Sequence, residues 1–293
     1  MFEKVLVPLD GSKIAEQVFP FVAELATAFS SEVICAGVCE PEESENSQAC
    51  QLYQNNQAEL LKSKIGTNAK LKSIVLPGRA ADEILSYAAK NNISLVIMTS
   101  HGRSDIKPWS LGSTVEKVLH KVEAPLLIVR ATEKSTAPGE TGLFSRVLAP
   151  LDGSEAGETT LPYLTGLMKQ LHSETTLLRV LASGKHVHTI GGIDYVRFQD
   201  YDLNSTKAKA KEYLENIGSK LEGKTAITKR DVRVGNPAEE IVKCAKETKA
   251  SLIILSSHGH SGIERWAYGS VTYKVLQTTD KSILLVPFAR GSS

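Results

Sequence analysis

Val5-Leu6-Val7-Pro8-Leu9-Asp10-Gly11-Ser12 recurs in this chain as Val147-Leu148-Ala149-Pro150-Leu151-Asp152-Gly153-Ser154, an offset of 142 residues. Two later landmarks also return, Ser100-His101-Gly102 as Ser257-His258-Gly259 and Gly112-Ser113 as Gly269-Ser270, both at an offset of 157 residues. Self-similarity at a fixed spacing indicates a duplicated structural unit. The sequence therefore predicts two copies of one domain. The second copy carries 15 additional residues between these landmarks, which we place around residues 184–202.

The repeat divides the chain of 293 residues into two domains of ordinary size. Residues 131–145 carry Lys, Ser, Thr, Pro and Gly with few apolar side chains, a composition typical of a linker. We therefore predict domain 1 over residues 1–132, a linker over 133–144 and domain 2 over 145–293.

Short apolar segments alternate with helical patterns within each copy. In the first copy the predicted strands cover residues 4–9, 32–38, 71–75, 95–99 and 126–129. A helix is predicted over 113–122, because Val115, Val118, Leu119 and Val122 follow the i, i+3, i+4, i+7 spacing of one helix face. Strands that alternate with helices favour right-handed βαβ crossovers and a parallel sheet with helices on both faces. The predicted fold class is α/β, with two tandem Rossmann-like domains.

Composition excludes several classes of protein. The chain has 34 Lys and Arg against 33 Asp and Glu, so a net charge of +1 gives no general attraction to nucleic acid or to an anionic membrane. The N-terminus lacks the pattern of a signal peptide, and no apolar run reaches the roughly 20 residues that span a bilayer. We therefore expect a cytoplasmic protein with neither nucleic acid nor membrane as partner. We expect its four cysteines, Cys35, Cys39, Cys50 and Cys244, to be free thiols.

The candidate ligand site lies where the strands end, because parallel sheets bind ligands at the carboxyl ends of their strands. Pro8 and Asp10 follow the first strand, and Pro150 and Asp152 follow its repeat. Either aspartate could accept hydrogen bonds from ribose hydroxyls. The alternative role for the aspartate is to cap the following helix.

A glycine-containing loop after the fourth strand is the candidate phosphate site. It runs from Gly102 to Gly112 and Ser113, and its repeat runs from Gly259 to Gly269 and Ser270. Glycines let the backbone approach an anion closely, and the N–H groups at the start of the following helix donate to it. Arg103 could add charge in the first loop, where His260 stands in the second. The alternative reading makes the glycines turn residues and Ser113 a helix cap.

Two further pairs of positions concern the recognition of an adenine base and the binding of a metal ion. The backbone near Val38 and Val180, at the end of the second strand in each copy, could read the edge of an adenine. His186 and His188 share one strand face, but no third ligand stands at a recognisable spacing, so we predict no metal site.

These residues resemble the universal stress protein family in its tandem form, over nearly the whole chain. Nucleotide-binding members carry Gly-x2-Gly-x9-Gly-Ser/Thr after an aspartate at the end of the first strand. The second and third glycines match in both copies, whereas Thr99 and Ser256 stand in place of the first. The alternative left open is that both hydroxyls bond phosphate instead. The complete set of predicted nucleotide-binding residues is Pro8, Asp10, Val38, Thr99, Gly102, Arg103, Gly112, Ser113, Thr114, Pro150, Asp152, Val180, Ser256, Gly259, His260, Gly269, Ser270 and Val271.

The resemblance implies a five-stranded parallel sheet in each domain and pairing of domains through the last strand. It also implies a role under stress, with ATP or AMP bound, with or without Mg²⁺, and little or no turnover. We expect pairing of the two domains within the chain, a homodimer and an unidentified protein partner. The sequence lacks a Gly-x4-Gly-Lys-Ser/Thr phosphate-binding loop, so catalysis beyond slow ATP hydrolysis is not predicted. The alternative is a scaffold that has lost nucleotide binding and regulates partners, which Thr99 and Ser256 favour.

Overall fold

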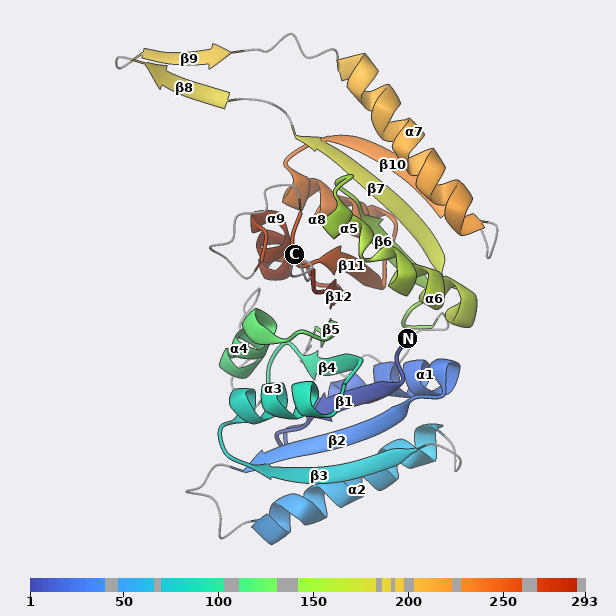
Figure 1. The fold of residues 1–293 in the computed structure, drawn as a ribbon, viewed down its shortest axis with the longest axis vertical. Coiled ribbons are helices and arrows are strands. Elements are labelled where there is room, and N and C mark those ends of the chain that lie inside the picture. Colours follow the sequence, from blue (N-terminus) through green and yellow to red (C-terminus); the bar gives the residue numbers. More distant parts are fainter. Residues whose placement is uncertain are drawn as a thin grey trace.

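A computed structural model describes residues 1–39, 47–65, 70–102, 111–130, 142–182, 186–190, 193–197, 203–222, 228–259 and 268–288. The two halves of the chain repeat the same order of elements (Figure 1). The first half comprises β1 (Lys4–Pro8), η1 (Ala15–Val18), α1 (Phe19–Phe29), β2 (Glu32–Cys39), α2 (Ser47–Ile65), β3 (Leu71–Pro77), α3 (Ala80–Lys90), β4 (Leu95–Thr99), α4 (Ser113–Lys121) and β5 (Leu126–Val129).

The second half begins in the same way and contains one addition. It comprises β6 (Arg146–Pro150), α5 (Glu155–Glu158), α6 (Leu161–Leu171), β7 (Glu174–Ala182), β8 (His186–Ile190), β9 (Ile193–Arg197), α7 (Leu203–Glu222), β10 (Thr228–Gly235), α8 (Pro237–Glu247), β11 (Leu252–Ser256), α9 (Ser270–Thr278) and β12 (Ser282–Val286). The antiparallel pair β8–β9 lies between β7 and α7, within the range predicted for the additional residues. Figure 1 shows this hairpin projecting away from the main sheet.

One ten-stranded sheet runs through the molecule in the order β10-β7-β6-β11-β12-β5-β4-β1-β2-β3. Within each half the five strands are parallel, which confirms the predicted α/β class. The halves join where β5 pairs antiparallel with β12, with Ile128 opposite Ile283 and Leu126 opposite Leu285. The last strands of the two copies therefore pair within the chain, as the resemblance implies.

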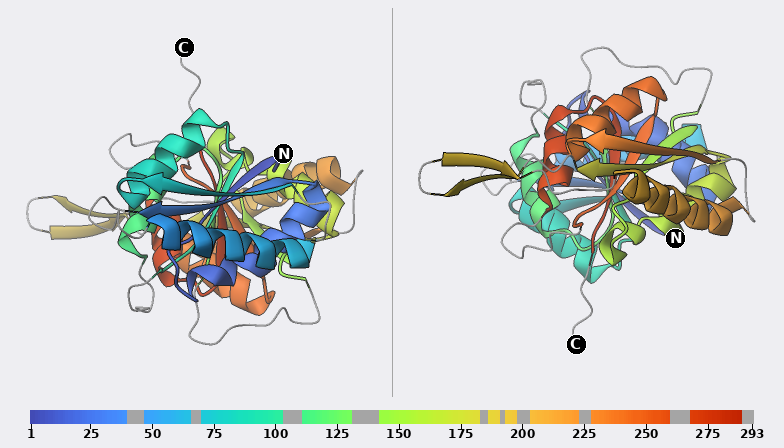
Figure 2. Two further views of the ribbon diagram at one scale, coloured as in Figure 1. Left: turned by 90° about the horizontal axis from the view of Figure 1, so that it is seen from below. Right: turned by 90° about the horizontal axis from the view of Figure 1, so that it is seen from above.

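Helices cover both faces of the sheet, as predicted, and the views along the long axis in Figure 2 show them on either side of the twisted strands. One core includes buried residues of α1, α2, α6 and α7, among them Phe19, Leu61 and Leu164. The other includes residues of α3, α4, α8 and α9, among them Val118 and Val275, so the predicted apolar face of α4 is buried. Each core continues across both halves, because the paired strands β5 and β12 contribute side chains to both.

The start of the second half packs against the first. The Glu24 carboxylate accepts hydrogen bonds from the backbone N–H groups of Leu143 (2.9 Å) and Phe144 (3.4 Å). The Phe144 ring is 1% exposed and lies edge-on to Phe21, with 5.7 Å between the ring centroids. Packing thus begins before residue 145, where we placed the domain boundary. Most of the predicted linker lies outside the described residues, and the three predicted ranges stay predictions.

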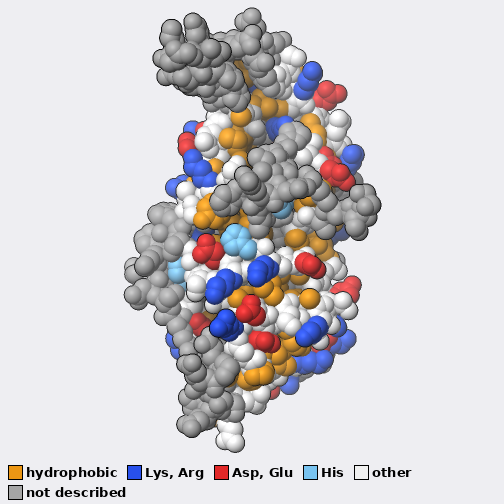
Figure 3. Space-filling view, turned by 60° about the vertical axis from the view of Figure 1, so that its left-hand side comes forward, with side chains coloured by type: hydrophobic (Ala, Val, Ile, Leu, Met, Phe, Trp, Pro, Cys, Tyr) orange, Lys and Arg blue, Asp and Glu red, His pale blue; other side chains and the backbone are white. Residues whose placement is uncertain are grey.

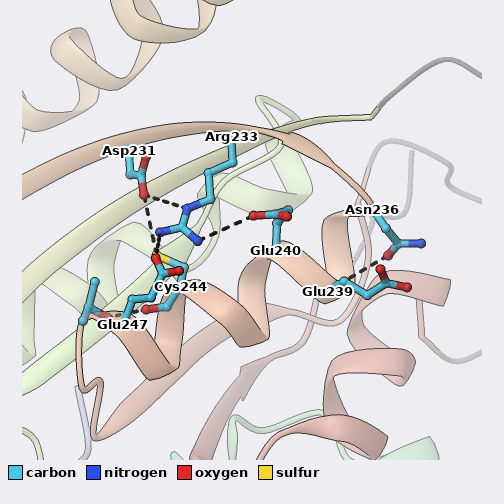
Figure 4. Close-up of polar contacts among 8 residues, drawn as sticks. Asp231, Arg233, Asn236, Glu239, Glu240, Cys244 and Glu247 are labelled. Carbon is cyan, nitrogen blue, oxygen red and sulfur yellow. Dashed lines mark hydrogen bonds and ion pairs between the residues drawn. The ribbon is translucent and has the colours of Figure 1, made fainter.

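An ion-pair network fastens the edge strand β10 to α8 (Figure 4). The Arg233 guanidinium lies 2.8 Å from Asp231, 2.6 Å from Glu247 and 3.5 Å from Glu240. The first copy has Leu76 at the position of Arg233, at the offset of 157 residues. The equivalent strand position therefore carries a charged side chain in one half and an apolar one in the other.

The expectation of four free thiols is wrong for Cys39, which is disulfide-bonded. Cys35 and Cys244 are free and buried. The scattered spacing of the cysteines along the chain shows no pattern typical of a disulfide, so the sequence did not reveal this bond. None of the helices in the described part of the chain is long and apolar enough to cross a membrane.

Candidate functional site

Each half of the sheet has a cavity at the carboxyl ends of its strands. Site 1, of about 320 Å³, lies where β1 and β4 end, and site 2, of about 440 Å³, lies where β6 and β11 end. The strand order reverses between β1 and β4, and equally between β6 and β11, because the chain crosses to opposite sides of the sheet there. Such a reversal is where open α/β sheets bind ligands.

Most of the predicted residues line these two cavities. Those at site 1 are Pro8, Asp10, Val38, Thr99, Gly102, Gly112, Ser113 and Thr114. Those at site 2 are Pro150, Asp152, Val180, Ser256, Gly259, Gly269, Ser270 and Val271. Arg103 and His260 lie outside the described residues. The structure thus brings the predicted segments together, and their role in binding a nucleotide stays a prediction.

The Asp-Gly-Ser segment forms the same turn at both sites. At site 1, Oδ1 of Asp10 accepts hydrogen bonds from the backbone N–H of Ser12 (3.0 Å) and from its hydroxyl (2.7 Å). Ser12 Oγ then accepts from the backbone N–H of Ala15, the first residue of η1, at 3.1 Å. Asp152 holds Ser154 at site 2 in the same way, and Gly11 and Gly153 adopt positive φ values of 86° and 76°. One carboxylate oxygen therefore stabilises the turn, and the side chain that caps the following helix at site 2 is that of Ser154, not of Asp152.

The second carboxylate oxygen faces the glycine loop. A Cβ atom added to Gly102 would overlap Oδ2 of Asp10, and one added to Gly259 would lie 2.5 Å from Oδ2 of Asp152. A side chain on either glycine would therefore have to displace the aspartate carboxylate. The aspartate and the first glycine of the loop are therefore matched to each other at both sites.

The helices that begin at the two cavities lack side-chain caps. Gly112 precedes α4 and Gly269 precedes α9, and neither helix start has a side-chain cap hydrogen bond. Elsewhere Ser154 caps α5 and Asn236 caps α8. The first backbone N–H groups of a helix need partners from outside the helix, and they carry the positive end of its dipole. Both cavities thus present donors suited to an anion.

The Thr99 and Ser256 hydroxyls already have partners in the protein. Thr99 is 5% exposed, and its hydroxyl donates to the backbone carbonyl of His101 at 2.5 Å. The Ser256 hydroxyl lies 3.4 Å from that of Thr159, which donates to it. Because the single Thr99 proton is used within the loop, this arrangement does not offer it to a phosphate.

Sequence reasoning missed the histidines of the two loops. His101 and His258 line the cavities, and each ring Nδ1 lies within hydrogen-bond distance of the preceding serine hydroxyl, at 3.1 Å and 3.0 Å. Burial, and then the charge of Arg130, lower the pKa of His101. The sequence contained a signal for them, because each histidine directly precedes the loop glycine that lies against the aspartate.

Other lining residues were missed for different reasons. Met98 and Ala80 at site 1 and Pro237 at site 2 belong to apolar or helical segments that show no functional pattern. Arg179 at site 2 had a visible signal, because it is a charge within the apolar run Leu177-Leu178-Arg179-Val180-Leu181.

Charges on the surface drawn in Figure 3 are mixed. Lys and Arg side chains alternate with Asp and Glu on this face, with hydrophobic side chains between them. No group of three or more His, Cys, Asp or Glu suited to a metal occurs among the described residues, and the side chains of His186 and His188 are not among those described. Positive charge is therefore not concentrated on this face.

Comparison with known proteins gives consistent matches in both halves. A family model described as the universal stress protein family matches residues 1–130 and 143–287. Universal stress protein YxiE of Bacillus subtilis is 32% identical over 150 residues, which are 49% of this chain and 99% of that protein. Universal stress protein Slr1230 of Synechocystis is 24% identical over 312 residues, covering 96% of this chain and 99% of its own length. A universal stress protein from Archaeoglobus fulgidus superposes with a TM-score of 0.70 at 20% identity, over 98% of this chain and 99% of that one.

Proposed function

Because the chain belongs to the universal stress protein family, we propose that it is a cytoplasmic stress-response protein that binds an adenine nucleotide, ATP or AMP, in each of two sites. Binding rather than turnover is the proposed activity, so the bound nucleotide acts as a signal that alters how the protein meets its partners. A homodimer, an unidentified protein partner and Mg²⁺ beside the phosphates belong to the same proposal.

One observation carries this proposal. At both sites an uncapped helix start, a carboxylate and a glycine without room for a side chain face one cavity. Helix N-termini favour phosphate, and a carboxylate at the strand end accepts from ribose hydroxyls. That the same set occurs twice in one chain argues against an accident of loop geometry.

The proposed layout follows the chemistry of the cavity. The phosphates lie at Gly112, Ser113 and Thr114 in site 1 and at Gly269, Ser270 and Val271 in site 2. The ribose lies at Asp10 or Asp152, whose Oδ2 atoms face the glycine loop. The base lies near Val38 or Val180, between apolar side chains at the end of the second strand. Arg103 and His260 add phosphate contacts in this proposal.

A second candidate is a scaffold without nucleotide. Thr99 favours the scaffold, because nucleotide-binding relatives are expected to have glycine at this position. The Thr99 hydroxyl instead donates to the His101 carbonyl at 2.5 Å, within the loop. In that case the paired halves would serve as a rigid platform for a protein partner.

The two candidates are separated by analysis of ligand carried through purification. The protein is purified without added nucleotide and denatured, and the released small molecules are identified by mass spectrometry and quantified per chain. ATP or AMP at one or two per chain supports the proposal, provided that Gly112→Val with Gly269→Val removes it. These substitutions suit the fold, because a Cβ at either position makes no contact shorter than 3.5 Å. No released ligand, together with an unchanged melting temperature in millimolar ATP, would favour the scaffold.

A further inference from the structure

The two sites differ in charge at one position of the second strand. Arg179 lines site 2, and the equivalent residue of the first half is Gly37, which lies between the site 1 lining residues Ala36 and Val38. The strand registers support this equivalence, because Pro8 lies opposite Ala36 and Pro150 lies opposite Leu178, the residues just before Gly37 and Arg179. Site 2 therefore has a guanidinium where site 1 has no side chain.

The Arg179 guanidinium lies beside the ribose end of site 2. Its Nη1 donates to the backbone carbonyl of Leu151 at 3.2 Å, and its central carbon, Cζ, lies 5.9 Å from the centroid of the Tyr213 ring. A Cβ atom on Gly153 would be 3.2 Å from Nη1 and 3.5 Å from Nη2. The charge thus lies against the residue that follows Asp152.

Site 1 satisfies the same carbonyl without a charge. Leu9 occupies the position of Leu151, and its carbonyl accepts from Nε2 of Gln54 at 3.3 Å. Gln54 fills the space over Gly37, since a Cβ there would lie 2.5 Å from Nε2. Gln54 corresponds to Leu214 in the second half. The preceding residues establish this match, since Tyr53 donates to Glu16 and Tyr213 donates to the equivalent Glu158. The equivalent carbonyl therefore accepts from a neutral amide in site 1 and from a guanidinium in site 2.

The turn does not need a charge for that role, and the Tyr213 ring contacts the guanidinium through its face, which uses none of the N–H donors. In the described part of the chain no Asp or Glu forms an ion pair with Arg179, and its one hydrogen bond there goes to Leu151. A guanidinium has five N–H donors and binds phosphate in a bidentate manner. Most of these donors remain for a ligand.

From this we infer that site 2 selects a ribonucleotide with a second phosphate on its ribose, at the 2′ or 3′ hydroxyl, and that Arg179 binds that phosphate. The inference rests on the proposed nucleotide binding and adds the ligand class of one site. An arginine beside the ribose aspartate is the arrangement by which Rossmann-type sites accommodate a ribose phosphate. Site 1 has no such charge from its second strand and takes the plain nucleotide.

The test compares AMP with adenosine 2′,5′-bisphosphate and adenosine 3′,5′-bisphosphate by calorimetry. In Gly112→Val protein, where only site 2 is open, one bisphosphate should bind about tenfold or more tighter than AMP, the ratio that a charge-assisted hydrogen bond provides. In Gly269→Val protein, where only site 1 is open, no such preference is expected.

Three variants identify Arg179 as the source of the preference. Arg179→Gln retains a donor for the Leu151 carbonyl, as Gln54 does in site 1, and should reduce the ratio of bisphosphate affinity to AMP affinity at site 2 to about one. Arg146→Gln, which removes a positive charge at the other end of β6, should retain the preference. Gly37→Arg combined with Gln54→Leu should confer it on site 1.

The outcomes distinguish this inference from the proposed function. Equal binding of AMP and both bisphosphates at site 2, or a preference that survives Arg179→Gln, would overturn the inference and leave nucleotide binding intact. Tighter binding of GMP than of either bisphosphate, lost in Arg179→Gln, would show that the guanidinium reads the base, which also overturns the inference. Absence of any AMP binding would contradict the proposed function itself.

Discussion

Oδ2 of Asp10 lies so close to Gly102 that a Cβ atom on that glycine would overlap it. These residues are far apart in the sequence, one after β1 and the other after β4, and they meet because those strands are neighbours in the sheet. The Oδ1 atom of the same carboxylate holds the Ser12 turn. One oxygen of the Asp10 carboxylate therefore holds the turn after β1, and the other lies against the glycine loop after β4.

Gly102→Ala should destabilise the protein only when Asp10 is present. The added methyl displaces the carboxylate, and we expect a loss of about 1–3 kcal/mol in the free energy of unfolding, as for other overpacked sites. In an Asp10→Ala background the same substitution should be nearly neutral, because the clash is gone. Urea denaturation of the wild type, both single variants and the double variant measures this coupling. Equal losses in the two backgrounds would contradict it.

Stability should fall in mild acid because of His101. Its pKa is lowered in the folded protein by burial and by the Arg130 charge, so the unfolded chain takes up a proton first as the pH falls. The stabilisation is present above the ordinary pKa of about 6.5 and is lost as the pH falls from there through the lowered folded pKa.

His101→Gln should therefore flatten the dependence of unfolding free energy on pH below that point, and Arg130→Met should flatten it less, since its charge is the smaller cause. Chemical denaturation at several pH values provides the measurement. A slope unchanged in His101→Gln would refute this account of the loop.

Arg130 links the two halves of the chain. Its guanidinium, whose pKa burial lowers to about 10, donates to the Leu276 carbonyl near the end of α9. Arg130→Met should reduce the free energy of unfolding by about 1–3 kcal/mol, because the carbonyl loses a partner at a partly buried position. The exposed Lys121→Met in α4 is the matched control and should change it by less than about 0.5 kcal/mol. Equal effects of the two variants would mean that the Arg130 contact contributes little.

Two buried thiols should resist alkylation in the folded protein. Burial raises the pKa of Cys35 to about 12 and that of Cys244 to about 11, so the reactive thiolate is scarce near neutral pH. Iodoacetamide at pH 8 should modify neither residue until denaturant is added, as peptide mass spectrometry would show. Rapid labelling of Cys244 without denaturant would indicate that α8 opens away from β10.

Much of the architecture was predictable because it rests on local patterns that occur twice. The apolar strands and the face formed by Val115, Val118 and Leu119 are readable in one dimension, and the repeat predicts that the second half follows the first. The meeting of Asp10 with Gly102 also followed, because parallel strands end at a common edge.

Other features depend on contacts that one sequence does not display. Thr99 donates to a carbonyl two residues away, which its position in a motif does not reveal. Phe144 looked like part of a linker, and its burial depends on Phe21, far away in the sequence. The role of Arg179 becomes visible only when Gln54 is seen to hold the equivalent carbonyl in the other half.

The most direct test of nucleotide binding is a calorimetric titration of nucleotide-free protein with ATP. The wild type should bind two ATP per chain, Gly112→Val and Gly269→Val one each, and the double variant none, with all four proteins showing the same cooperative unfolding. A wild type that binds no ATP, or a double variant that binds as the wild type does, would contradict the claim that the two cavities are nucleotide sites.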